Sequence, residues 1–171
     1  LRVQRNTAAY VSKLRLVAEN ANSLMFIDGY VDPRNPDYGE FLDLLELASR
    51  RTTGAPLIEI HRKHYIEGRE FDGRPVLPLP DELAKRFREA WGARLASMGL
   101  NLEVFVWDRV HDRYLITNLV GISVPYGFAI SRSPAEQTTW TRLGRNDRDD
   151  VQREYDPAAK RHQLICRFRV P

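Results

Sequence analysis

An imidazole and a guanidinium stand two residues apart in segment 111–118, which reads His-Asp-Arg-Tyr-Leu-Ile-Thr-Asn. The apolar residues in this segment predict a β-strand, and alternate residues of a strand project from one face. We therefore expect His111 and Arg113 to point the same way. A guanidinium binds phosphate oxygens and an imidazole can act as a nucleophile, so the pair predicts a site for a phosphate-bearing ligand.

The segment resembles the signature of the phospholipase D superfamily, which is a histidine, any residue, a lysine, four residues, an aspartate and then a glycine-serine-asparagine element. The resemblance implies that His111 would attack phosphorus, with Arg113 in place of the lysine that holds phosphate oxygens. Asn118 stands where the family has its aspartate, and an amide cannot stabilise an imidazolium as a carboxylate does. Two copies of the motif build one site in this family, so a chain with one copy would act as a homodimer.

The glycine element is altered too, because segment 127–130 reads Gly-Phe-Ala-Ile and lacks the expected hydroxyl and amide. The pattern is closer to non-catalytic members, such as the lipid-binding C-terminal domain of microtubule-interacting-and-transport-domain proteins, and to bacterial modules found beside antiviral defence genes. We therefore expect binding of a phosphate-bearing ligand, nucleic acid or acidic lipid, without turnover. The alternatives are an active phosphodiesterase or nuclease assembled by dimerisation, and a structural module that docks other domains of a longer protein.

A first additional basic cluster, His61, Arg62 and Lys63, follows a predicted strand. Open α/β sheets usually bind ligands at this edge, so these side chains could line the ligand beside His111; an ordinary surface loop is the alternative. Asp28, Tyr30 and Asp32 follow another predicted strand, where turn formation around Pro33 is the favoured interpretation.

A second cluster places Arg142, Arg145 and Arg148 at three-residue steps near Trp140. If the stretch is helical or turn-like these arginines share a face, which suits a phosphate backbone or an acidic partner. Three aspartates lie among them, at positions 147, 149 and 150, and they slightly favour a solvated charged face.

Composition excludes several other classes of protein. The 171 residues carry 26 Lys plus Arg against 23 Asp plus Glu, and this net charge of +3 is too small to indicate nucleic-acid binding by itself. The single cysteine, Cys166, rules out an intrachain disulfide and is expected in the core, and the cytoplasm is the expected compartment.

No cofactor motif is present, and the spacing of His61 and His64 matches no strong zinc motif, so neither a cofactor nor a metal is expected. No membrane span or signal peptide is expected, and the start at Leu1 suggests an excised piece.

The periodicity of the apolar residues predicts the helices and strands that position these residues. Apolar residues at helical spacing predict helices that begin near Thr7, Phe41 and Leu83. Short apolar runs predict strands over 23–27, 56–60, 101–107, 114–117, 122–124, 127–130 and 162–169. Alternation of helices and strands in the first half favours one α/β domain over 1–171, with a mixed, mostly parallel sheet covered by helices on both faces. The resemblance implies that this domain is of the phospholipase D type.

Overall fold

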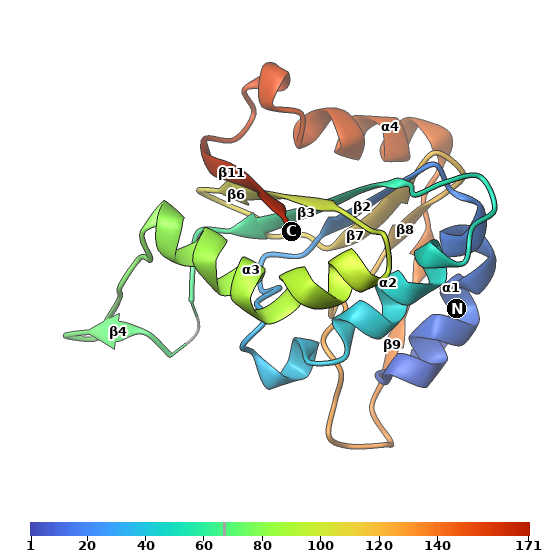
Figure 1. The fold of residues 1–171 in the computed structure, drawn as a ribbon, viewed down its shortest axis with the longest axis horizontal. Helices are drawn as coiled ribbons and strands as arrows, with labels where there is room; N and C mark the ends of the chain where they lie inside the picture. Colours follow the sequence, from blue (N-terminus) through green and yellow to red (C-terminus); the bar gives the residue numbers. More distant parts are fainter. Residues whose placement is uncertain (67) are drawn as a thin grey trace.

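The computed structural model of the protein describes residues 1–66 and 68–171. Its centre is a seven-stranded sheet with strand order β10-β8-β7-β2-β3-β6-β11 (Figure 1). In that order the strands are Thr141–Arg142, Gly121–Ser123, Tyr114–Thr117, Ser23–Ile27, Leu57–Lys63, Leu102–Trp107 and Leu164–Val170. One face is covered by α1 (Thr7–Asn20), α2 (Phe41–Ser49) and α3 (Pro80–Ser97), and the other by α4 (Arg145–Glu154) (Figure 1). The predicted α/β class and the helices on both faces are confirmed.

The sheet is mixed, but the expectation that it is mostly parallel is wrong. Strands β2, β3 and β6 run parallel to one another. Strands β7, β8, β10 and β11 are all added antiparallel to their neighbours. The physical reason lies in the connections, because a short turn such as the one from β7 to β8 can join only antiparallel strands, whereas a parallel pair needs a long crossover.

The central strands are apolar on both sides because both faces of the sheet are covered. On β2, Leu24 and Phe26 belong to the large core beneath α1, α2 and α3, whereas Met25 and Ile27 belong to the smaller core beneath α4. The N-terminus of α1 is capped by Asn6, whose Oδ1 accepts a hydrogen bond of 2.8 Å from the backbone N–H of Ala9. These elements therefore form where the apolar pattern predicts them.

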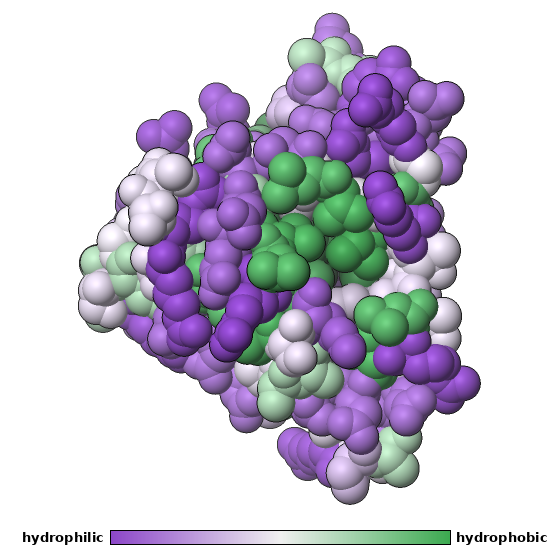
Figure 2. Space-filling view, turned by 90° about the vertical axis from the view of Figure 1, so that its right-hand side faces the viewer, coloured by the Kyte–Doolittle hydropathy of each residue, from purple (hydrophilic) through white to green (hydrophobic). Residues whose placement is uncertain are grey.

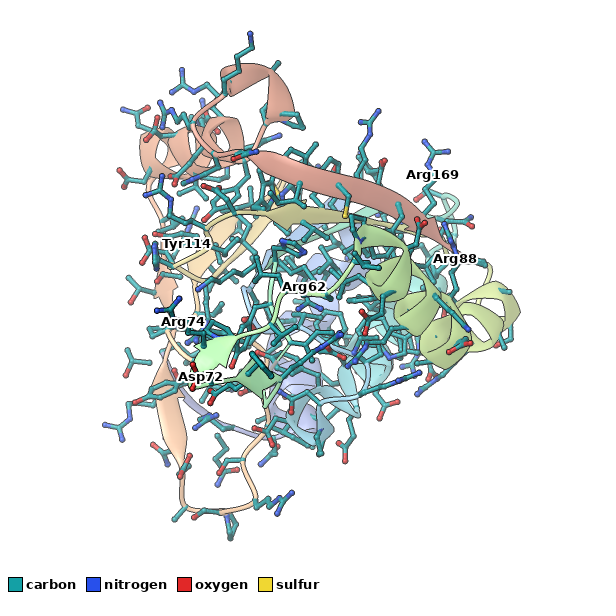
Figure 3. All side chains as sticks on the ribbon, turned by 90° about the vertical axis from the view of Figure 1, so that its left-hand side faces the viewer. Arg62, Asp72, Arg74, Arg88, Tyr114 and Arg169 are labelled. Carbon is teal, nitrogen blue, oxygen red and sulfur yellow. The ribbon has the colours of Figure 1, made fainter. Side chains whose placement is uncertain are left out.

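Several elements have no counterpart in the prediction. Strand β1 (Arg2–Gln4) pairs antiparallel with β9 (Gln137–Thr139), which lies far away in the sequence. Two 3-10 turns, η1 (Pro36–Tyr38) and η2 (Pro157–Ala159), follow β2 and α4. Strands β4 (Glu70–Phe71) and β5 (Arg74–Pro75) form a hairpin that projects from the body, with Asp72 and Arg74 at its end (Figures 1 and 3). The predicted strand over 127–130 is wrong, because the chain turns at Gly127 and continues without regular structure.

The two ends of the central strands lie on opposite sides of the molecule, and one of these sides carries an apolar patch. The carboxyl ends of β2, β3 and β6 lie on the side seen in Figure 3, and Figure 2 shows the opposite side, where apolar side chains gather in a patch. A groove of about 360 Å³ is lined there by residues of α1, β8 and β10, including Leu14, Val17 and Ile122. Among the residues that the structure describes, no helix is both long and apolar enough to cross a membrane.

Candidate functional site

Some of the predicted site residues, His111 and Arg113 among them, lie at the edge where the parallel strands end. Ile27, the last residue of β2, pairs with His61 of β3 on one side and with Tyr114, the first residue of β7, on the other. Lys63 at the end of β3 pairs with Trp107 at the end of β6. Segments that follow three strands and the segment that precedes β7 therefore meet at one edge, marked by Tyr114 in Figure 3.

A buried carboxylate, Asp28, lies at the centre of this edge with none of its surface exposed (0%). Its oxygens accept hydrogen bonds from the Tyr38 hydroxyl at 2.8 Å and from the backbone N–H groups of Phe128 at 3.1 Å and Tyr30 at 3.2 Å. Arg113 Nε lies 3.4 Å from Asp28 Oδ1. Burial raises the pKa of Asp28, and the hydrogen bonds from Phe128 and Tyr38 and the charge of Arg113 oppose that rise.

The turn at Gly127 is folded directly against Asp28. Gly127 has a φ of +60°, and a Cβ at this position would lie 1.9 Å from Asp28 Oδ2. Phe128 fixes the turn to the large core, because its ring packs edge-on against the rings of Phe26 and Phe41, with centroid distances of 5.1 Å and 5.9 Å. The segment that the resemblance assigns to phosphate contact therefore holds an internal carboxylate instead.

Arg113 and His111 lie at the same edge in different environments. Arg113 Nη1 donates a hydrogen bond of 2.6 Å to Pro125 O, and the guanidinium carbon lies 5.0 Å from the centre of the Tyr30 ring. With 23% of its side chain exposed, Arg113 is half-buried over Asp28. His111 is exposed, precedes β7 rather than lying in it, and forms no hydrogen bond or ion pair with residues 1–66 or 68–171.

The prediction that this strand ends at residue 60, with His61, Arg62 and Lys63 following it, is wrong, because β3 continues to Lys63. His61 points into the α4 core, where its Nδ1 accepts a hydrogen bond of 3.1 Å from Trp107 Nε1. Burial lowers the pKa of His61, and Glu59, 3.5 Å from its Nε2, opposes that shift. Its neighbour Arg62 points to the other face, as expected for successive residues of a strand.

Lys63 is the member of this cluster that stays at the edge. Its backbone N–H donates to Gly29 O at 3.2 Å, and its Nζ lies 5.9 Å from the centre of the Tyr65 ring. A Cβ added to Gly29 would touch Val110 O at 3.1 Å and the Lys63 side chain at 3.5 Å, so the segment before His111 approaches β3 closely here. Lys63 and His111 therefore belong to the same edge.

Asn118 lies at the other end of β7 from His111, and Arg142 pairs with Ile122 in the outermost strand, β10, rather than joining His111. Asn118 Oδ1 accepts a hydrogen bond of 2.7 Å from Asn22 N, which precedes β2. The Asn118 carbonyl accepts one of 3.3 Å from Arg148 Nη1 in the first turn of α4. Arg142 lies in β10 and Arg145 begins α4, so the three arginines do not form one helical face.

Asp28 and Asp32 are the residues whose role sequence reasoning missed. The favoured interpretation, turn formation, is confirmed, because Asp28 and Asp32 each accept a hydrogen bond from the backbone N–H two residues further on. Both side chains are in addition buried and paired with arginines, which turn formation does not imply. The sequence signal that could have indicated this is their position directly after a buried parallel strand, next to the ligand edge of an α/β sheet. No group of three or more His, Cys, Asp or Glu side chains within residues 1–66 and 68–171 could hold a metal ion.

Comparison with known proteins gives little further information. No family model matches the chain, and no curated protein matches its sequence. Among solved structures, the chain is similar to TrmBL2, an archaeal chromatin protein whose structure shows a novel mode of DNA binding, with 14% sequence identity and a TM-score of 0.48. The similarity covers 96% of this chain and 52% of that one, so this chain spans about half the length of TrmBL2. The resemblance to phospholipase D stays a prediction from the motif.

Proposed function

We propose that this protein is a phospholipase-D-like domain that binds a phosphate-bearing ligand, nucleic acid or acidic lipid, at the edge around His111 without turning it over. The proposal rests on one observation, which is that His111 stays exposed at this edge while Arg113 reaches inward to a buried carboxylate. Phosphate oxygens would contact His111, Lys63 and the guanidinium nitrogen of Arg113 that faces neither Asp28 nor Pro125.

Asp28 is the reason for proposing binding without turnover. In a catalytic member the arginine or lysine and the glycine element neutralise the charge of the phosphoryl group during its transfer. Here Arg113 and the Gly127 turn already hold a carboxylate. An ionised carboxylate in that place would repel a second anion, and this repulsion is strong where water is excluded. A ligand phosphate would therefore lie outside the space between Arg113 and the Gly127 turn, against the side chains of His111 and Lys63.

The binding test compares His111→Ala and a His111→Ala/Lys63→Ala double variant with wild type. Arg15→Ala on α1, where the side chain is 59% exposed, removes one charge elsewhere and serves as the matched control. Binding is measured by fluorescence anisotropy with labelled single-stranded and double-stranded DNA, and by cosedimentation with vesicles containing phosphatidylserine. The double variant should lose about tenfold in affinity, and the dependence on log salt should fall by about one per cation removed.

The DNA and vesicle measurements distinguish a nucleic-acid ligand from a lipid ligand. The Arg15→Ala control distinguishes binding at the His111 edge from attraction to the overall positive charge. Equal losses in Arg15→Ala and in the double variant would contradict the proposed site, and so would a wild type that binds neither probe. The absence of turnover is tested separately with bis(p-nitrophenyl) phosphate. Hydrolysis by wild type that disappears in His111→Ala would show an active phosphodiesterase and overturn this part of the proposal.

A further inference from the structure

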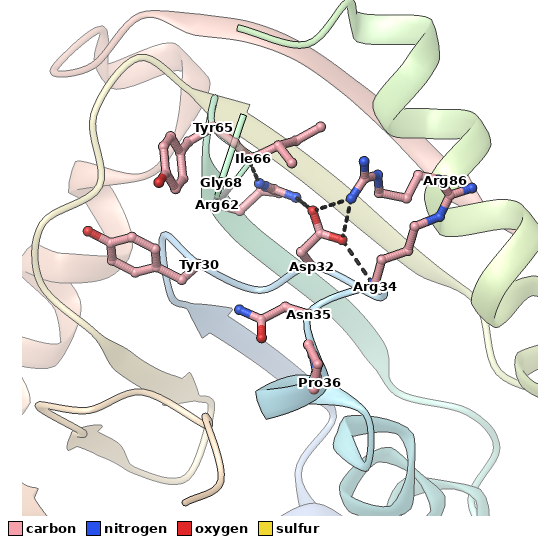
Figure 4. Close-up of a pocket in the computed structure, with 10 residues that line it drawn as sticks. All are labelled: Tyr30, Asp32, Arg34, Asn35, Pro36, Arg62, Tyr65, Ile66, Gly68 and Arg86. Atoms are coloured by element: carbon pink, nitrogen blue, oxygen red, sulfur yellow. Dashed lines mark hydrogen bonds and ion pairs between the residues drawn. The ribbon is translucent and has the colours of Figure 1, made fainter. Parts of the chain in front are cut away.

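A second site of positive charge lies beside the His111 edge, in a pocket of about 260 Å³ between the segment after β2, the end of β3 and α3. Figure 4 shows Arg62 from β3 and Arg86 from α3 pointing toward Asp32, with Tyr30 and Tyr65 on the other side of the pocket. Ligand pockets for drug-sized molecules span roughly 300 to 1,000 Å³, so this pocket suits a small group.

Arg62 is the feature that needs explanation, because its side chain is only 1% exposed. Its Nε donates to Lys63 O at 3.1 Å and its Nη2 donates to Tyr65 O. Its Nη1 is buried and forms no hydrogen bond with any described residue, and Asp32 Oδ2 lies 3.6 Å away. A buried charged donor without an acceptor is costly, so such a group in a pocket indicates an anionic ligand.

Asp32 does not meet this need, because its hydrogen bonds go elsewhere. Arg86 Nη1 lies 3.1 Å from each of its two oxygens, and the backbone N–H of Arg34 donates to Oδ1 at 2.9 Å. Arg86 Nε is also buried without a hydrogen bond to the described residues. Arg34, the third arginine in the lining, is paired with Glu89 at 3.3 Å. Among the residues that the structure describes, Arg62 and Arg86 therefore face a single carboxylate, which leaves one positive charge in excess.

We propose that this pocket binds the phosphate group of a small phosphomonoester, held by Arg62 and Arg86. Because Arg62 Nη1 is buried, a phosphate oxygen would accept from it only after the groups over it, Asp32 among them, move aside. Tetrahedral phosphate offers several acceptors to guanidinium donors that are fixed in a plane. Tyr30 forms a wall of the pocket and also lies under the guanidinium of Arg113, so it separates this site from the His111 edge. The proposal is therefore independent of the proposed function.

The test measures stabilisation of the protein by inorganic phosphate and by phenyl phosphate, with sodium chloride at matched ionic strength as the reference. A ligand that binds only the folded state raises the melting temperature in proportion to its affinity. Arg86→Gln removes one pocket cation and should weaken binding about tenfold. Asp32→Asn removes the competing carboxylate, so it should strengthen phosphate binding. Circular dichroism checks the fold of each variant.

Three further variants keep the test decisive. Arg34→Gln, at a side chain that is 59% exposed, should fold normally and weaken phosphate binding, whereas Arg15→Gln on α1 should have no effect. His111→Ala should retain the phosphate effect in full, which separates this site from the His111 edge. A phosphate effect that is absent in wild type, or equal in Asp32→Asn, Arg86→Gln and Arg15→Gln, would overturn the proposal.

Discussion

Replacing Gly127 by alanine tests whether Asp28 and the turn beside it form one packed unit. The new Cβ would lie 1.9 Å from Asp28 Oδ2, in a backbone conformation with φ of +60°. An alanine in this left-handed region costs about 1 kcal/mol. Relief of the clash also requires the turn to move away from the carboxylate. The hydrogen bond from Phe128 N would then be lost, at about 1.5 to 3 kcal/mol for a buried ionised acceptor.

Together these costs amount to about 2.5 to 4 kcal/mol, a large part of the roughly 5 to 15 kcal/mol that stabilises most domains. Gly99→Ala is the matched control, because Gly99 has a φ of +65° and a Cβ there would meet nothing within 4 Å. Urea unfolding of the two variants gives the free energies of unfolding. A difference of about 2 kcal/mol moves the urea midpoint by about 1 M at a slope of about 2 kcal/mol/M. Equal midpoints in the two variants would refute the close packing against Asp28.

Two other predictions concern the buried imidazole of His61 and the half-buried thiol of Cys166. Because burial lowers the pKa of His61 in the folded state, the unfolded chain binds a proton first, and the free energy of unfolding should fall as the pH drops below about 6.5. His61→Gln should reduce that pH dependence in urea unfolding at pH 7.5 and 5.5, and an unchanged slope would contradict it. Burial raises the pKa of the half-buried Cys166 thiol, so its reaction with iodoacetamide should be several-fold slower than in urea-unfolded protein. Equal rates would show that the thiol is accessible.

The elements that the sequence predicts well are those whose apolar residues repeat with the period of the element. The helix from Thr7, the strand over 23–27 and the strand over 114–117 all form where their periodicity places them. By contrast, α4 buries only Val151, so its ten residues carry almost no apolar pattern from which a helix could be predicted. Strands β1 and β9 are three residues each and depend on a pairing between distant segments, which no local pattern indicates.

The end of β3 shows why polar residues at a site are hard to interpret from sequence. His61 and Arg62 read as loop residues because buried strands are usually apolar. Each has a polar group of another element on its own face of the sheet, because Trp107 is hydrogen-bonded to His61 and Asp32 lies 3.6 Å from Arg62 without a hydrogen bond. Those partners lie on other elements, so the residue types alone could not distinguish a buried strand from an exposed basic loop.

The same argument applies to the candidate site itself. His111 and Arg113 of the motif lie together where the parallel strands end, but the motif cannot show that Arg113 is paired with Asp28, 85 positions earlier in the chain. This pairing changes what the residue type implies. A guanidinium that neutralises a buried carboxylate has less charge to offer a ligand, and removing it would leave an unpaired charge in the interior at a cost of several kcal/mol. Loss of binding in an Arg113 variant would therefore report on the fold as much as on the ligand, which makes the exposed His111 and the half-buried Lys63 the residues that test the function.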